Sequence, residues 1–269
     1  MKSRFNLLLI VSLLSHFAFA GTNIHLASID EHILIKLMSA HVGQDAGTSI
    51  KNASAIFLGT PYGANRLIGS NTEKEQLVID LGHLDCFTYL DYVESLRQSD
   101  SMLTFFENII NTRYSSGQID YLSRKHFFSD WISDDHHNIT DVTSQISPKF
   151  NTVTKYLNQK NNGETYIAGL NMSPRKITYI RGVDVNHAVI SKLKDGDYIG
   201  IYTNINGLDV THTGIFIRDN NGPVLRHASS SSVNRKVVDS PFIDYVKSKP
   251  GILVYRAQGI KKASINLAP

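Results

Sequence analysis

The sequence has little of several features that mark specialised proteins. One residue in 269 is cysteine, so no disulfide can form within the chain. The charged fraction is 19%, and the 7 prolines and 18 glycines follow no repeat, which excludes a disordered chain, a collagen and a solenoid. No apolar run is long enough for a comfortable membrane span. The 42% of apolar residues suffice for one large domain or two small ones.

The first twenty residues have the pattern of a cleavable export signal. Lys2 and Arg4 form a basic start, residues 7–14 are apolar, and residues 18–20 (Ala-Phe-Ala) match a signal-peptidase site. The alternative is an uncleaved anchor. Cleavage would remove two of the 27 basic residues and none of the 24 acidic ones, which leaves 25 against 24. We therefore expect an exported bacterial protein, periplasmic or secreted, with no stable membrane anchor and without the basic face that nucleic-acid binding requires.

Hydrophobic spacing predicts a helical part followed by a β part. Helices are expected over 29–42 and 101–113, and a short strand over 76–81. Another helix is predicted to begin at or just after Cys86, with Asp85 as its N-cap.

The C-terminal third has the pattern of an antiparallel sheet. Strands are predicted over 197–203, 209–218, 223–228, 233–238 and 252–255. The fold class is therefore α+β, with the cysteine-bearing helix packed on the sheet. The expected divisions are a signal peptide (1–20), an N-terminal helical extension (21–48), a main domain (49–257) with a mostly helical insertion at about 114–190, and a tail (258–269).

Two histidines lie on the arms of a predicted β-hairpin. Residues 219–222 (Asp-Asn-Asn-Gly) form a strong turn signal, and an even-numbered loop centred there pairs residues whose numbers add to 441. His227 then faces Gly214, and His212 is diagonal to His227 on the same face, about 7–8 Å away at Cα. A three-residue loop or a bulge would separate the two imidazoles.

A cysteine at a helix start and a histidine on a nearby strand can act as nucleophile and base. The helix N-terminus favours the thiolate of Cys86. An imidazole can take the thiol proton and return it to a leaving amine, while a second polar group orients that imidazole. The negative charge of the Asp85 carboxylate disfavours a thiolate at Cys86, so Asp85 is expected to cap the helix or contact substrate. The alternative for Cys86 is a buried small apolar residue.

Several separated segments resemble known cell-wall hydrolases. The NlpC-type papain-like enzymes are similar at 84–96 (LDCFTYLDYVESL), 207–217 (GLDVTHTGIFI) and 225–230 (LRHASS). One branch, the bacterial N-acetylmuramoyl-L-alanine amidase-like family once known only as a domain of unknown function, is also similar at 57–67, 113–132 and 141–143. The resemblance covers roughly residues 50–256 and implies a papain-like fold.

The resemblance also implies a reaction. The expected activity is hydrolysis of the amide between the lactyl group of N-acetylmuramic acid and L-alanine, with muropeptides as substrates. Carried over by motif, Cys86 is the nucleophile, His212 the base and His227 the orienting group. The backbone N–H of Cys86 and the hydroxyl of Tyr62 are candidate donors to the oxyanion. No metal or organic cofactor is expected.

Three further residues have two readings each. Arg124 could bind a stem-peptide carboxylate or form a structural salt bridge. Trp131 could pack on the sugar or belong to the core, and Asp209 could orient substrate or begin a strand. The run 134–137 (Asp-Asp-His-His) is expected to be a solvated loop rather than a metal site, because adjacent side chains point apart.

The leading function has three rivals. An enzyme with the same machinery could cut within the stem peptide, or could transfer the acyl group to another amine. A protein of a different class would bind the cell wall without catalysis.

Overall fold

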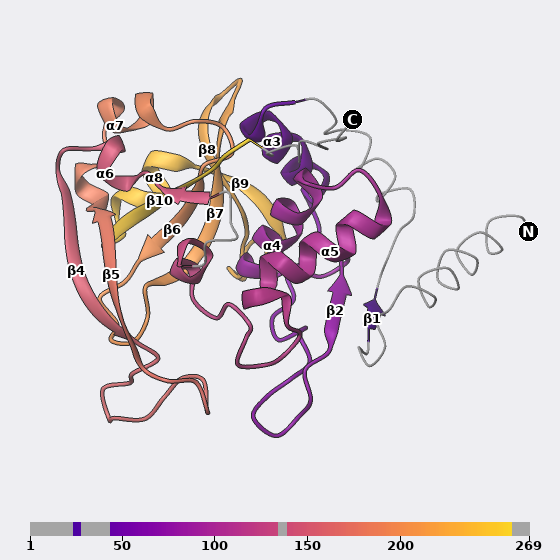
Figure 1. Ribbon diagram of the computed structural model, residues 1–269. Coiled ribbons are helices and arrows are strands. Elements are labelled where there is room, and N and C mark those ends of the chain that lie inside the picture. Colours follow the sequence, from indigo (N-terminus) through magenta and orange to yellow (C-terminus); the bar gives the residue numbers. More distant parts are fainter. Residues whose placement is uncertain (1–23, 28–43, 134–138, 260–269) are drawn as a thin grey trace, which may run out of the picture.

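The computed structural model describes residues 24–27, 44–133 and 139–259 (Figure 1). The predicted export signal, the helix expected over 29–42 and most of the tail lie outside these residues. Strand β1 (Ile24–Ala27) lies in the segment expected to be a helical extension, and it pairs in parallel with β2 (Leu77–Asp80). In the described ranges, no helix is both long and apolar enough to cross a membrane.

An antiparallel sheet of eight strands forms the centre of the fold. Its order is β4-β5-β10-β6-β7-β8-β9, and β3 pairs with another part of β10. The strands are β3 (Ile139–Asp141), β4 (Phe150–Leu157), β5 (Ser173–Ile180), β6 (Tyr198–Tyr202), β7 (Val210–Asp219), β8 (Gly222–Ala228), β9 (Val237–Pro241) and β10 (Gly251–Ala257). The predicted mixture of helices with an antiparallel sheet is confirmed.

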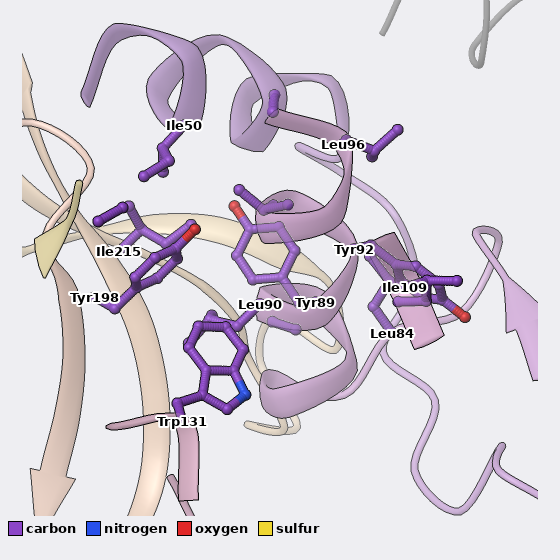
Figure 2. Packing of buried hydrophobic residues seen from close by; sticks show 14 of the residues in the cluster. Ile50, Leu84, Tyr89, Leu90, Tyr92, Leu96, Ile109, Trp131, Tyr198 and Ile215 are labelled. Carbon is purple, nitrogen blue, oxygen red and sulfur yellow. The ribbon is translucent and has the colours of Figure 1, made fainter. Parts of the chain in front are cut away.

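The sheet separates two apolar clusters, each covered by helices. Ile215 and Ile217 of β7 join one cluster, whereas Phe216 between them joins the other, as alternation along a strand requires. Figure 2 shows the first cluster, where Tyr89 and Trp131 lie beside the helices. The helices are α3 (Ala46–Ile56), α4 (Cys86–Arg97) and α5 (Met102–Arg113) on this side, and α6 (Thr143–Ile146), α7 (His187–Lys192) and α8 (Phe242–Lys247) on the other. Short 3₁₀ helices span Ser115–Gly117, Phe128–Ile132 and Gly182–Asp184.

Helix α4 begins at Cys86 because the residue before it caps the helix. The Asp85 carboxylate accepts hydrogen bonds from the backbone N–H groups of Phe87 (3.0 Å) and Thr88 (2.7 Å). The Thr88 hydroxyl lies 3.0 Å from the Asp85 backbone N–H and accepts its hydrogen bond, which completes a capping box. The cap fixes Cys86 as the first residue of a helix that is otherwise almost entirely buried.

The mostly helical insertion expected over 114–190 is wrong. Strands β4 and β5 form an eight-pair antiparallel hairpin in this region, and β5 joins the sheet through Ile180 and Ile252. Two physical features hide the hairpin from the sequence. The buried positions of β4 include Lys155, which breaks the apolar alternation, and the long connection 158–172 offers no two-residue turn.

The strand predicted over 233–238 begins only at Val237. Backbone hydrogen bonds from Asn234 and Arg235 to Ser231 close a turn before it, and Arg235 has a φ of 46°. This left-handed conformation is incompatible with an extended strand.

Candidate active site

The Cys86 side chain is partly exposed in a cleft at the start of α4. The cleft has a volume of about 140 Å³. Its walls come from the N-terminus of α4, from residues 126–128, and from residues 208–213, which include His212. The structure therefore brings the predicted nucleophile and base to one cavity that a ligand could enter.

Thr213 fixes the start of α4 against strand β7. Its hydroxyl donates a 2.7 Å hydrogen bond to the backbone carbonyl of Cys86. Because Thr213 follows His212 directly, this bond sets the position of the thiol-bearing residue relative to the imidazole-bearing strand. Thr213 was not a predicted site residue, although it lies within the 207–217 segment that carries the resemblance.

The register of the β7–β8 hairpin confirms the predicted geometry of the two histidines. Asp219 pairs with Gly222, and Ile215 pairs with Arg226, so the loop has two residues and paired numbers add to 441. A Cβ placed on Gly214 would lie 3.0 Å from the Cβ of His227, which shows how closely the arms approach there. The two rings meet edge to face, and His212 Nε2 lies 2.7 Å from His227 Nδ1.

A β-bulge lies immediately before His212. His212 pairs with Ile201, whereas Val210 pairs with the next residue, Tyr202, so Thr211 is an extra residue in β7. The bulge faces β6 rather than β8, and it precedes the two histidine positions. The relation between the imidazoles is therefore preserved, while the backbone entering the cleft from residues 208–211 is redirected.

The histidine pair continues into a hydrogen-bonded chain. His227 is 2% exposed, and its Nε2 lies 3.0 Å from the hydroxyl oxygen of Ser240 on β9. If His212 Nε2–H donates to His227 Nδ1, and His227 Nε2–H donates to Ser240, then Nδ1 of His212 carries no proton. In this tautomer, Nδ1 of His212 can accept a proton.

The resting site disfavours charge. Burial first, and then the Asp85 carboxylate, raise the pKa of the Cys86 thiol to about 11, while hydrogen bonds from Thr213 act in the opposite direction. Burial lowers the pKa of His227 to about 4, and burial, His227 and Lys249 lower that of His212 to about 3. The thiol and both imidazoles are therefore neutral at rest, and a proton transfer from the thiol to an imidazole would create two opposite charges that stabilise each other.

Two tyrosines lie near the thiol. Burial, and then a charge on Cys86, raise the pKa values of both Tyr62 and Tyr245, so both phenols lie within electrostatic range of the sulfur, although neither lines the cleft. Tyr62 is half-buried, and Arg235 lies over its ring. Tyr245 of α8 packs on His227 with ring centroids 5.0 Å apart. It was not a predicted site residue, because the sequence predicted no helix over α8.

The N-acetylmuramoyl-L-alanine amidase-like (AmiA-like) family model matches residues 52–252. The chain belongs to this family. No curated protein matches it. Family membership implies an amidase-like hydrolase whose substrate is peptidoglycan.

Solved structures show the same family likeness. An N-acetylmuramoyl-L-alanine amidase from Bacteroides uniformis is 30% identical, with a TM-score of 0.65 over 79% of this chain and 99% of its own. A Legionella pneumophila protein is 25% identical, with a TM-score of 0.71 over 84% of this chain and 93% of its own. A Bacteroides fragilis protein named as a xylanase candidate is 28% identical, with a TM-score of 0.59 over 76% of this chain and 98% of its own.

In this amidase-like chain, Trp131 does not form a sugar platform. Its side chain is fully buried in the first cluster, near Tyr198 (Figure 2). The ring is edge-on to Tyr198, with centroids 5.2 Å apart, and stacked on Phe87, with centroids 5.9 Å apart. A sugar has no exposed face of this indole on which to pack. The expected substrate contact is therefore wrong, and the core alternative is the one observed.

The other predicted site residues are held by structural contacts. Arg124 forms a two-pronged ion pair with Glu75, whose carboxylate also accepts from the Tyr114 hydroxyl, and it lies outside the lining of the Cys86 cleft. Asp85 caps α4. Asp209 lines the cleft but is 2% exposed, and its carboxylate accepts from the backbone N–H of Ser129 at 2.6 Å. The 134–137 run lies outside the described residues.

Proposed function

We propose that this amidase-like hydrolase is an exported cysteine enzyme of the NlpC-type papain-like superfamily. Its reaction would cleave the amide between the lactyl group of N-acetylmuramic acid and L-alanine in muropeptides. The observation that carries the proposal is the hydrogen-bonded chain His212–His227–Ser240, which ends in the same cleft as Cys86.

The proposed reaction begins with transfer of the Cys86 proton to Nδ1 of His212. The sulfur attacks the lactyl carbonyl carbon, and the carbonyl oxygen becomes an oxyanion. The helix N-terminus of α4 and the hydroxyl of Tyr62 support that negative charge. The tetrahedral intermediate then collapses, the C–N bond breaks, and His212 returns its proton to the alanine amine.

The second half releases the thioester. Water gives a proton to His212 and attacks the acyl carbon, after which the C–S bond breaks and the sulfur regains its proton. His227 holds the imidazole of His212 in the required tautomer through both halves, and Ser240 does the same for His227.

A glycosidase mechanism fits this cleft less well. Glycoside hydrolysis generally needs two carboxyl groups on either side of the bond that breaks. Asp209, which lines the cleft, and Asp85, which precedes Cys86, both accept hydrogen bonds from backbone N–H groups that the fold requires.

Export remains part of the proposal and rests on residues 1–20. Cell fractionation, with the mass of the mature N-terminus, checks it: a chain beginning at Gly21 outside the cytoplasm is expected. Retention of the intact N-terminus in the cytoplasm would contradict it.

Mass analysis of digested muropeptides tests the reaction. Wild type is expected to release free sugar and intact stem peptide, whereas Cys86→Ala should bind muropeptides without turnover. Shortened peptides that still carry sugar would replace the proposal with an endopeptidase, and new amides formed with an added amine would indicate acyl transfer. Unchanged turnover by Cys86→Ala would reject the cysteine mechanism.

A further inference from the structure

Two cationic side chains of the β4–β5 hairpin contact segments that adjoin the Cys86 cleft. Lys155 of β4 and Arg175 of β5 are cross-strand partners, so both lie on one face of the hairpin. Lys155 is buried and Arg175 is half-buried. A buried ammonium is costly unless all its donors are satisfied, which makes the surroundings of Lys155 informative.

Lys155 is enclosed by three backbone carbonyl oxygens of a single loop. Its Nζ donates to Thr203 at 2.5 Å, Ile205 at 2.7 Å and Leu208 at 2.8 Å. An ammonium group has three N–H donors, so the 203–209 loop between β6 and β7 takes all of them.

The same loop supplies one wall of the cleft. Leu208 and Asp209 line it directly, and Asp209 joins the loop to the opposite wall by accepting from Ser129 N–H. Arg175 holds that opposite wall, since it donates to the Ser129 hydroxyl and the Asp130 carboxylate, each at 3.1 Å. The hairpin thus contacts one wall directly, through Lys155 and the Leu208 carbonyl, and reaches the residues next to the 126–128 wall through Arg175.

Backbone packing brings the loop against the end of β4. Gly207 has a φ of 79°, and a Cβ there would lie 2.3 Å from the carbonyl oxygen of Gln159. The Asn158 N–H also donates to the Gly207 carbonyl at 2.9 Å. Only glycine permits this approach. The loop position therefore depends on the hairpin both through the Lys155 ammonium and through the backbone contact of Gly207 with residues 158–159.

We propose that Lys155 is a positioning residue, whose ammonium fixes the 203–209 loop and so places Leu208 and Asp209 against the substrate. It acts through the loop rather than on the reacting atoms. The inference rests on the proposed function, because that function puts the muropeptide in this cleft.

The variant Lys155→Met tests the proposal, because methionine keeps the apolar stem and removes the three donors. KM for the muropeptide is expected to rise about tenfold or more, with a much smaller change in kcat, because a displaced wall impairs substrate placement. Hydrogen exchange should quicken at amides 203–209 and remain unchanged in β10. The matched control Lys176→Met removes an exposed lysine from the paired strand and should leave KM and exchange unchanged.

A second variant keeps the test decisive if Lys155→Met does not fold. Gly207→Ala pushes the loop from Gln159 while leaving Lys155 intact, and it should raise KM and loop exchange in the same way. A folded Lys155→Met protein with wild-type KM, or with wild-type exchange in the loop, would overturn the inference. Exchange needs no substrate, so it still decides whether Lys155 fixes the loop even if wild type hydrolyses no muropeptide.

Discussion

Two hairpins of the sheet, β7–β8 and β4–β5, are built differently and contribute differently to the site. The β7–β8 hairpin has a two-residue turn, and His212 and His227 lie on one face of it, at the end away from the turn. The β4–β5 hairpin has the long connection 158–172, and the cross-strand pair Lys155 and Arg175 lies on one face of it. Local turn chemistry sets the geometry of the first, whereas contacts with distant loops set that of the second. The groups suited to proton transfer thus lie on the locally determined hairpin.

The largest effects are expected along the β7–β8 hydrogen-bonded chain. Substituting His212→Gln should lower kcat/KM by about 10³-fold, because the base is lost. His227→Gln should cost about 10²-fold and Ser240→Ala about tenfold or less, because each acts one hydrogen bond further from the base. Steady-state kinetics on a muropeptide measure the series. Equal losses at all three positions would contradict the expectation that the effect declines with each hydrogen bond between the residue and His212.

A large effect on stability is expected in the 3₁₀ helix Phe128–Ile132, which Arg175 of β5 contacts and whose Trp131 packs in the core. Trp131→Ala should lower the free energy of unfolding by about 3–5 kcal/mol, because it empties a fully buried site. Denaturant unfolding measures this loss. The milder Trp131→Phe variant should leave KM at the wild-type value. A marked rise in KM with unchanged stability would instead show that Trp131 contacts the sugar.

A smaller effect is expected from the half-buried cation of β4–β5. Arg175→Met removes an ion pair whose partners are 21% and 18% exposed, so its stability loss should be about 1 kcal/mol or less. KM should rise less than in Lys155→Met. A larger rise in KM for Arg175→Met than for Lys155→Met would show that Arg175, through its contacts with Ser129 and Asp130, has the main positioning role.

The smallest effect concerns the pH dependence of the β7–β8 site. The pKa of His212 lies below its ordinary value, so the acid limb of kcat/KM should fall well below pH 6.5. Lys249 contributes to that lowering, and removing its positive charge makes His212 easier to protonate. Lys249→Met should therefore move the acid limb to higher pH by a fraction of a unit.

The control for this shift is Lys247→Met, which removes an exposed lysine of α8. It should leave the pH profile in place. An acid limb that moves equally in both variants would indicate a general effect of net charge rather than a local effect on His212.

The predictable parts of the molecule are those set by short-range chemistry. Asp85 before an apolar run marks the start of α4, and the Asn220-Asn221 turn fixes which residues of β7 and β8 share a face. The β4–β5 hairpin was not predictable, since a buried Lys155 is stabilised by carbonyl groups about 50 residues away in the chain. The bulge at Thr211 likewise leaves no mark in the sequence.

Side-chain roles were less predictable than strand positions. A tryptophan at position 131 is compatible with a sugar platform and with a core, and only burial distinguishes the two. Arg124 was ambiguous in the same way, because its partner Glu75 is 49 residues distant. Tyr245 carries no pattern of its own, and only the packing of α8 beside His227 brings it to the site.

The environment of Cys86 also bears on how the protein withstands oxidants. Peroxides attack the thiolate far faster than the thiol. With a pKa of about 11, Cys86 is almost wholly protonated near neutral pH, and the chain has no second cysteine to pair with it. Sulfenic acid should therefore form slowly in the resting protein, which would preserve the sulfur for the proposed reaction.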